Sequence, residues 1–273
     1  MPGCRHHRQR PMILVFIRHK NPAKLLALPL YAVHLIRRLD RAALVALAFI
    51  AMLVALLTQT AIHVLAPNTR VLIGKVIVVD PGHGGIDPGA HDREGTTEKE
   101  IVLDIARRLF GLLGKAKGIP IQTRHGDWSL DELYPHESTR HRQDLAARVH
   151  IANRINADAM VCIHVNKSPH ASARGPVTFY NQASQDSRRL ASCIQRRLSE
   201  LQPRGAGGIV KGDFYILRNS KVPTVIAEVG FISNPEEKKL LLTPSYRQDI
   251  AEAILAGLAD FFEGQGVSPA ITN

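Results

Sequence analysis

The chain has 273 residues, of which 45% are apolar, and this size fits one folded domain with an appendage. Its net charge of +11 is uneven, because residues 1–41 hold nine Lys or Arg against one acid and so carry +8 of it. The nearly neutral remainder argues against nucleic-acid binding by the folded part, and three cysteines are too few for a disulfide framework.

An apolar stretch follows this basic segment. Residues 42–57 carry no charge, and the apolar pattern continues to residue 66, which is long enough to cross a bilayer. Lys and Arg crowd the N-terminal side, so the charge-bias rule predicts residues 1–41 in the cytoplasm and residues 67–273 outside it. A buried core helix and a cleaved signal peptide are the alternatives. The length, the flanking charges and the lack of a sharp cleavage site favour an uncleaved transmembrane anchor over 42–66.

Beyond a short linker over 67–74, strand and helix patterns alternate. This alternation indicates an α/β fold over 75–263, with a mostly parallel twisted sheet flanked by helices. Residues 264–273 are predicted to form a tail. Apolar β-branched runs predict strands over 75–80, 119–123, 159–166, 175–181, 214–217 and 224–229. Helical periodicity predicts helices over 98–113, 142–156, 186–201 and 246–263.

Two histidines and a carboxylate are expected at one edge of this sheet. His83 follows the first strand in a glycine-rich loop, Glu98 opens the next helix, and His164 lies near the end of a later strand. Ligands of parallel sheets bind beyond the carboxyl ends of the strands, and two histidines with one carboxylate are a common catalytic zinc set. Singly, each residue has an ordinary explanation, such as a surface histidine or a glutamate that complements the helix dipole. Together they favour a metal hydrolase of undefined substrate.

Two further acids belong to the same pattern. Glu228 is an ionisable residue in a strand that otherwise has core composition, and beside a metal-bound water it would act as general base. Asp80 ends the first strand and is predicted to orient the His83 loop rather than to bind metal itself.

Five blocks of the sequence occur in the order of a known family. They are VVDPGHGGIDPGA (78–90), EKEIVLDIA (98–106), TRHGD (123–127), RVHIANRINADAMVCIHVN (148–166) and FYILRNSKVPTVIAEVGFISNPEE (214–237). In these blocks the chain resembles the zinc-dependent N-acetylmuramoyl-L-alanine amidases, over about residues 75–263. The membrane anchor and compact domain are most similar to the germination-specific subtype, which acts in muramic-lactam formation in the spore cortex.

The resemblance implies a site and a reaction. One zinc ion would be held by His83, Glu98 and His164, with Glu228 as catalytic general base. Water activated by zinc would cleave the amide between the lactyl group of N-acetylmuramic acid and the L-alanine of the stem peptide. Peptidoglycan lies on the predicted outer side of the membrane, so the expected location is the cell envelope or the spore intermembrane space.

The chain departs from the family pattern in two places. Cys162 stands where many members have Ser, two residues before His164, and we interpret it as a packing residue. The sequence also runs directly from the predicted helix over 186–201 to residues 207–219, without the inserted helix that plugs the site of some members. Any regulation would need another route, such as an activator protein or expression timing.

Arg124, Arg148 and Asn166 are the candidate substrate-binding residues. An arginine fork could clamp a carboxylate of the stem peptide, but either arginine could equally be a structural ion-pair partner, and for Arg148 the structural role is preferred.

A zinc peptidase or a deacetylase of the same polymer is an alternative enzyme, and a catalytically silent wall-binding protein is an alternative of another class. The filled ligand and base positions argue against the silent protein.

Overall fold

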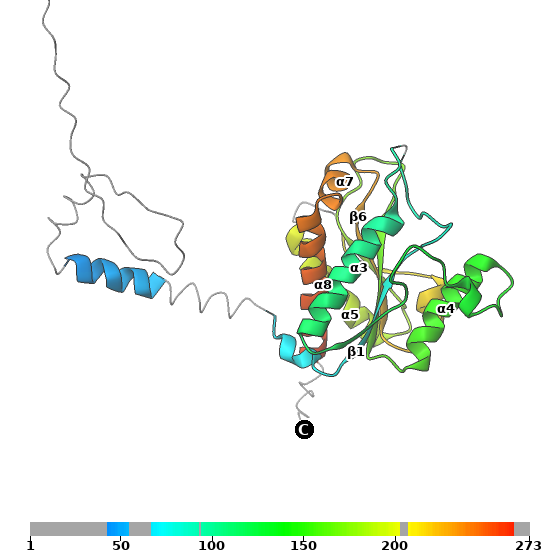
Figure 1. Cartoon of the computed structure of the whole chain (residues 1–273), viewed down its shortest axis with the longest axis horizontal. Helices are drawn as coiled ribbons and strands as arrows, with labels where there is room; N and C mark the ends of the chain where they lie inside the picture. Colours follow the sequence, from blue (N-terminus) through cyan, green and yellow to red (C-terminus); the bar gives the residue numbers. More distant parts are fainter. Residues whose placement is uncertain (1–42, 55–66, 93, 203–206, 265–273) are drawn as a thin grey trace, which may run out of the picture. The chain divides into compact units, whose positions relative to one another are not determined.

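The structure is a computed structural model that describes residues 43–54, 67–92, 94–202 and 207–264. The chain divides into two units, 1–66 and 67–273. In the first unit a helix runs over 43–54, drawn in blue in Figure 1, and its large apolar side chains are exposed. Within the described ranges no helix has the length and apolar character needed to span a bilayer. The basic segment 1–41, the predicted span beyond residue 54 and the tail after residue 264 lie outside these ranges.

The second unit contains a six-stranded mixed sheet in the order β2-β1-β3-β6-β4-β5. Of the strand pairs within the described residues, only β4 with β6 is antiparallel, so the predicted mostly parallel sheet is confirmed with one exception. The strands are β1 (Val76–Pro81), β2 (Ile119–Gln122), β3 (Ala159–Asn166), β4 (Val177–Tyr180), β5 (Ile209–Lys211) and β6 (Thr224–Phe231).

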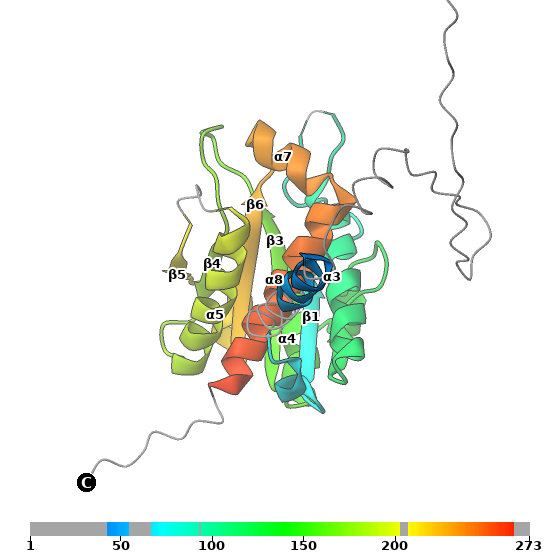
Figure 2. The same cartoon turned by 90° about the vertical axis from the view of Figure 1, so that its left-hand side faces the viewer.

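Helices cover both faces of the sheet, as Figures 1 and 2 show. One face is covered by α3 (Glu98–Lys115), α5 (Gln185–Leu201) and α8 (Pro244–Glu263), and the other by α4 (Arg140–Arg154) and α6 (Tyr215–Asn219). Shorter elements are η1 (Thr69–Leu72), η2 (Asp131–Leu133) and α7 (Pro235–Leu241).

Strand alternation decides which face each polar residue meets. Val79, Val161 and Ala227 point into the larger core beneath α3, α5 and α8, whereas Val78, Met160 and Ile226 point into the smaller core beneath α4 and α6. Side chains two residues apart share a face. Asp80, His164 and Glu228 therefore lie on the α4 side, at the carboxyl ends of three adjacent strands.

The structure differs from the predicted elements in several places. The strand predicted over 214–217 is wrong, because Phe214 is the N-cap of α6 and 215–217 are its first residues. A short apolar run does not distinguish a strand from a buried helical turn. The linker 67–74 contains η1, whose Leu72 is fully buried. Helix α7 is missing from the prediction although Asn234 caps it and Pro235 occupies its first turn.

Candidate metal centre and catalytic cavity

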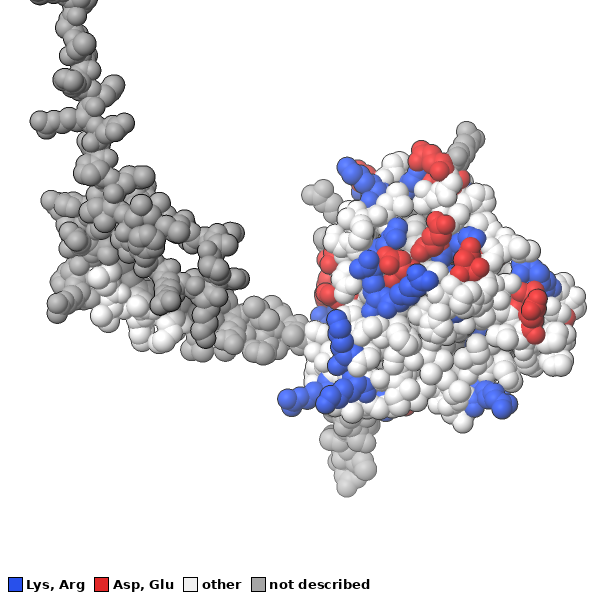
Figure 3. All heavy atoms as spheres, viewed as in Figure 1, with Lys and Arg blue, Asp and Glu red and all other residues white. Residues whose placement is uncertain are grey.

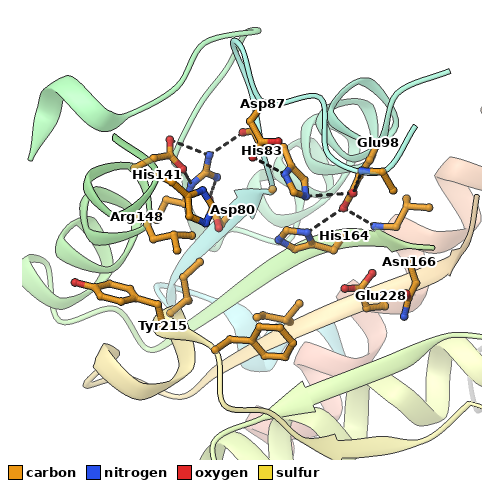
Figure 4. A pocket seen from close by; sticks show the side chains of 18 of the residues that line it. Asp80, His83, Asp87, Glu98, His141, Arg148, His164, Asn166, Tyr215 and Glu228 are labelled. Atoms are coloured by element: carbon orange, nitrogen blue, oxygen red, sulfur yellow. Dashed lines mark hydrogen bonds and ion pairs between the residues drawn. The ribbon is translucent and has the colours of Figure 1, made fainter. Parts of the chain in front are cut away.

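Three side chains converge at the carboxyl edge of the sheet (Figure 4). His83 lies in the loop after β1, Glu98 is the first residue of α3, and His164 lies near the end of β3. Nε2 of His83 lies 3.1 Å from Oε2 of Glu98, and Nδ1 of His164 lies 2.9 Å from Oε1. One possible ligand atom from each side chain lies within 4.8 Å of the others, so the group could hold a metal ion.

Glu98 is fixed by the backbone around it. Its side chain is buried, Oε2 accepts the N–H of Ala90 at 2.7 Å, and Oε1 accepts the N–H of Val165 at 2.8 Å. Burial alone would raise the pKa of Glu98, but the hydrogen bonds and charges of His164 and His83 hold that pKa well below its usual range. The site therefore presents an immobile negative charge between two imidazoles, a setting that suits a cation.

Asp87 orients the His83 ring. Its Oδ2 lies 2.8 Å from Nδ1 of His83, which leaves Nε2 directed at Glu98. Burial would lower the pKa of His83, but the hydrogen bonds and charges of Glu98 and then of Asp87 outweigh it and raise the pKa to about 9. Asp87 is absent from the residues predicted from the sequence, although its place four residues after His83 in the same loop is a usable signal.

Two glycines make room for this group. A Cβ on Gly82 would lie 2.3 Å from the ring of His164, and a Cβ on Gly89 would lie 2.5 Å from Oε2 of Glu98. His83 itself has φ 60°, in the left-handed region that costs a non-glycine residue about 1–2 kcal/mol. The glycine-rich loop thus serves the close approach of three side chains, and its strained residue needs support from outside the loop.

Two buried arginines supply that support. Arg124 donates to the carbonyl oxygens of Pro81 at 3.0 Å and Gly82 at 2.7 Å. Arg148 donates to those of Pro81 at 2.9 Å and His83 at 2.7 Å. Three consecutive carbonyls therefore accept from guanidinium groups that are closed off from solvent. Of the two roles that the sequence left open for these arginines, this geometry favours the structural one.

Two aspartates balance the charge of Arg148. Oδ1 of Asp80 lies 2.7 Å from its Nη1, Oδ2 of Asp144 lies 2.7 Å from its Nε, and Thr123 donates to Asp80 at 2.5 Å. Burial would raise the pKa of Asp80, but the charge of Arg148 and the hydroxyl of Thr123 hold it below its usual range. Asp80 thus reaches the His83 loop through Arg148, which is the position of a supporting residue and not of a ligand.

Glu228 enters the site from β6. It is the register partner of His164 in the parallel β3–β6 pair, and its Oε2 is buried without a hydrogen-bond partner in the described part of the chain. Burial raises the pKa of Glu228 to about 7, against the opposing charge of His164. A buried carboxyl without a partner is unfavourable for folding, and one that titrates near neutrality suits proton transfer.

Cys162 lies two residues before His164 on the same strand. It is fully buried in the smaller core, and burial and then the charge of Asp80 raise the pKa of its thiol. The thiol therefore stays protonated, in agreement with a packing residue.

A cavity of about 350 Å³ opens over these groups. His83, Glu98, His164 and Glu228 line it, and Asn166, the third candidate substrate-binding residue, lines it as well. Figure 4 shows Tyr215 across the cavity from the three converging side chains. Apolar side chains in or beside α4, α6 and β6 line it too, namely Leu145, Phe214, Ile216 and Ile226, together with polar ones such as Asp87, His141 and Lys167. A concave site that combines apolar surface with several polar groups suits a polymer segment that carries an amide.

Known proteins match this domain in sequence and fold. A family model described as N-acetylmuramoyl-L-alanine amidase matches residues 77–260. A germination-specific N-acetylmuramoyl-L-alanine amidase of Bacillus subtilis is 35% identical over 207 residues, which are 74% of this chain and 86% of that protein. An uncharacterized cell wall amidase of Bacillus anthracis is 37% identical over 205 residues, but the match covers only 37% of its length.

A solved structure agrees with these matches. The CwlD amidase of Clostridioides difficile, in complex with the GerS lipoprotein, has a TM-score of 0.65 and 36% identity, and the match covers 70% of this chain and 100% of that one. Fold and comparisons define a hydrolase of a cell-wall amide. The chain belongs to the N-acetylmuramoyl-L-alanine amidase family, whose substrate is peptidoglycan.

Proposed function

We propose that this domain cleaves the amide between the lactyl group of N-acetylmuramic acid and the L-alanine of the stem peptide, with one zinc ion held by His83, Glu98 and His164. The observation that carries the proposal is the convergence of three ligand atoms within 4.8 Å, in a cavity that Glu228 also lines.

The donor set fits zinc. Two imidazole nitrogens and one carboxylate oxygen are ligands that zinc accepts, and three protein ligands leave a position open. The buried carboxylate of Glu98 lies between the two histidine rings and accepts two backbone N–H groups, so the protein itself fixes the positions of the three donors. When bound, zinc supplies Lewis-acid polarisation of the scissile carbonyl and of water.

Glu228 is proposed as the proton carrier. It takes a proton from water as the water oxygen attacks the scissile carbonyl, and it returns the proton to the alanine nitrogen as the C–N bond breaks. The absence of a hydrogen-bond partner for its Oε2 among the described residues supports this role, because the oxygen is free to receive a proton.

Mass spectrometry of muropeptides digested with the full chain, with and without zinc, tests the reaction. The proposal requires a zinc-dependent product with a free N-terminal L-alanine. Release of acetate or D-alanine would instead identify a deacetylase or a peptidase. His83→Ala should abolish stoichiometric zinc binding, and equimolar zinc retained by that variant would refute the ligand assignment.

We also propose an extracytoplasmic domain tethered by residues 42–66. The apolar character of that stretch, the basic residues before it and the location of peptidoglycan support this arrangement. Alkaline extraction of membranes from cells that produce the full chain tests it, because an anchored chain stays in the pellet. Recovery of the intact chain in the supernatant would contradict it.

A role in muramic-lactam formation in the spore cortex is a narrower proposal. Similarity to the germination-specific amidase and to CwlD supports it, and the complex of CwlD with the GerS lipoprotein supports a partner protein for this chain as well. Deletion of the gene should remove muramic lactam from cortex muropeptides. Unchanged muramic lactam would contradict the role.

A further inference from the structure

The amino ends of the parallel strands carry a group of exposed cationic side chains. Five cationic side chains are exposed there and make no ion pair with any residue that the structure describes: Arg70, Lys115, Lys117, Arg154 and Lys221. Three large apolar side chains lie between them in sequence, Ile73, Ile119 and Ile155, with exposures of 56%, 47% and 40%. We call these eight residues the amino rim.

Hydrogen bonds join the turns of the amino rim into one surface. Gly74 N–H donates to the carbonyl of Lys117 at 2.9 Å, and Ile119 N–H donates to that of Lys75 at 2.8 Å. Asp158 N–H donates to the carbonyl of Val76 at 2.8 Å, which brings the turn after α4 to the start of β1. The turns after η1, α3 and α4 therefore lie side by side.

The turn before β6 completes the surface, because Lys221 N–H donates to the side-chain oxygen of Asn153 at 2.8 Å. Figure 3 shows Lys and Arg along the lower edge of the domain, where Figure 1 places η1 and the ends of α3 and α4.

Two acidic residues lie beside the amino rim and offset its five cations only in part. Asp158 pairs with Lys75 at 3.5 Å, whereas Glu263 accepts from the neutral amide of Asn68 at 3.2 Å and keeps its charge. A surface with exposed isoleucines beside unpaired cations can bind a membrane in two ways. The cations attract anionic lipid headgroups, and the isoleucines enter the boundary between the headgroups and the acyl chains.

The chain enters the domain at this same surface. Arg70 lies four residues after residue 66, the end of the proposed anchor, so an extended chain places it at most about 14 Å from the bilayer boundary. The Debye length at physiological salt is about 8 Å, so attraction by anionic lipid acts once the amino rim comes closer to the bilayer than this outer limit. The metal centre lies at the other ends of the strands, about 20 Å away for strands of this length.

We propose that the amino rim docks on an anionic phospholipid bilayer and thereby turns the catalytic cavity away from the membrane, toward peptidoglycan. The inference rests on the proposed anchor and not on the amidase chemistry. Docking would give the tethered domain a fixed orientation, so substrate would meet the open side of the cavity.

The isolated domain 67–273 is suitable for the test. Both apolar cores lie within residues 72–262, and the whole solved CwlD chain is matched by 70% of this chain, so the domain is a folding unit. We expect it to co-sediment with vesicles of phosphatidylcholine and phosphatidylglycerol and not with vesicles of phosphatidylcholine alone. Lys115→Gln with Lys117→Gln should weaken partitioning roughly 25-fold, about fivefold for each charge.

Arg174→Gln with Lys239→Gln is the control for charge, because it removes two positive charges from exposed residues near the carboxyl edge. Arg174 pairs there with Glu236 at 3.5 Å, and an exposed pair of this kind contributes little to stability. Equal binding to both vesicles, or equal loss in both double variants, would overturn the proposal. Binding to isolated cell walls without binding to vesicles would overturn it in favour of an anionic wall polymer. Cleavage of soluble muropeptides by the rim variant should be unchanged, so failure of docking and failure of the amidase assignment are distinguishable.

The full chain supplies a second readout. In nanodiscs that contain phosphatidylglycerol, the amines of Lys115 and Lys117 should react more slowly with an acylating reagent than in phosphatidylcholine nanodiscs, while Lys239 reacts equally in both. Equal reactivity of all three lysines in the two lipids would contradict docking.

Discussion

The two ends of the sheet differ in the burial and pairing of their charged side chains. At the carboxyl edge, charged groups such as Asp80, Glu98 and Arg148 are buried, and each has a partner within hydrogen-bond distance. At the amino rim, the cations are exposed and have no partner among the described residues. A buried charge must be paired at short range and fixes geometry, whereas a solvated charge costs little and acts through the field it projects. The carboxyl edge therefore suits chemistry, and the amino rim suits attraction to a surface.

The largest expected effect is at Glu228. Glu228→Gln preserves the size of the side chain but removes the proton acceptor, so amidase activity should fall by about 10²–10⁴ while zinc content stays equimolar. Activity by muropeptide release and zinc by elemental analysis measure the two quantities. Glu252→Gln, on the exposed side of α8, is the control and should change neither. Near-normal turnover in Glu228→Gln would remove Glu228 from the proposed role.

The buried ion pairs of Arg148 are expected to give the next largest effect. Arg148→Met leaves Asp80 and Asp144 without their cation and releases the carbonyls of Pro81 and His83, so the free energy of unfolding should fall by about 3–5 kcal/mol. Chemical denaturation measures it.

The control for that prediction is an exposed pair. Asp186→Asn breaks the pair with Arg189 on the surface, and it should cost no more than about 1 kcal/mol. A similar loss in both variants would mean that the carboxyl edge does not depend on its buried pairs.

These supporting residues show how far sequence pattern reaches. His83, Glu98, His164 and Glu228 stand at ends of strands and helices, so their meeting in one cavity follows from the topology of a parallel sheet. The role of Arg148 depends on three-dimensional contacts that lie 65 to 68 residues apart in the chain, and no local pattern distinguishes a substrate clamp from a loop support.

The secondary structure likewise has parts that the sequence pattern predicts and parts that it does not. Long strands and helices with clear periodicity were predictable, as β3 over 159–166 demonstrates. The five-residue helix α6 was not, because Ile216 and Leu217 are buried in a run too short to have a readable period.

Zinc affinity should depend on pH through His83. Its pKa of about 9 in the metal-free protein means that a proton occupies the imidazole at neutral pH, and this proton must leave when metal binds. As pH rises from 6 to 8, the competing proton becomes rarer and the apparent zinc Kd should fall about tenfold per unit. Competition with a chromogenic chelator measures the Kd. A Kd independent of pH over this range would show that His83 is neutral before metal binding.

Asp87 gives a smaller effect at the same ring. Asp87→Asn removes the carboxylate that orients Nδ1 of His83, so zinc affinity should weaken about 10–100-fold although the pKa of His83 falls and proton competition eases. The same variant should flatten the dependence of zinc affinity on pH. As a control, Asp213→Asn changes an exposed carboxylate paired with Arg218 and should leave zinc affinity unchanged. Unaltered affinity in Asp87→Asn would mean that packing alone orients His83.

The smallest expected effect concerns the stability of the amino rim. Lys115 and Lys117 are exposed and form no ion pair with a described residue, so changing both to Gln should alter the free energy of unfolding by at most about 0.5 kcal/mol per site. For a domain of this size that corresponds to a shift in Tm of a few degrees at most. The same double variant should lose most of its affinity for anionic vesicles, so at the amino rim a substitution changes membrane binding without changing stability. At Arg148, by contrast, a substitution should change both stability and the geometry of the site. A loss of stability comparable to that of Arg148→Met would show that these lysines belong to the fold, and the contrast between the two ends of the sheet would fail.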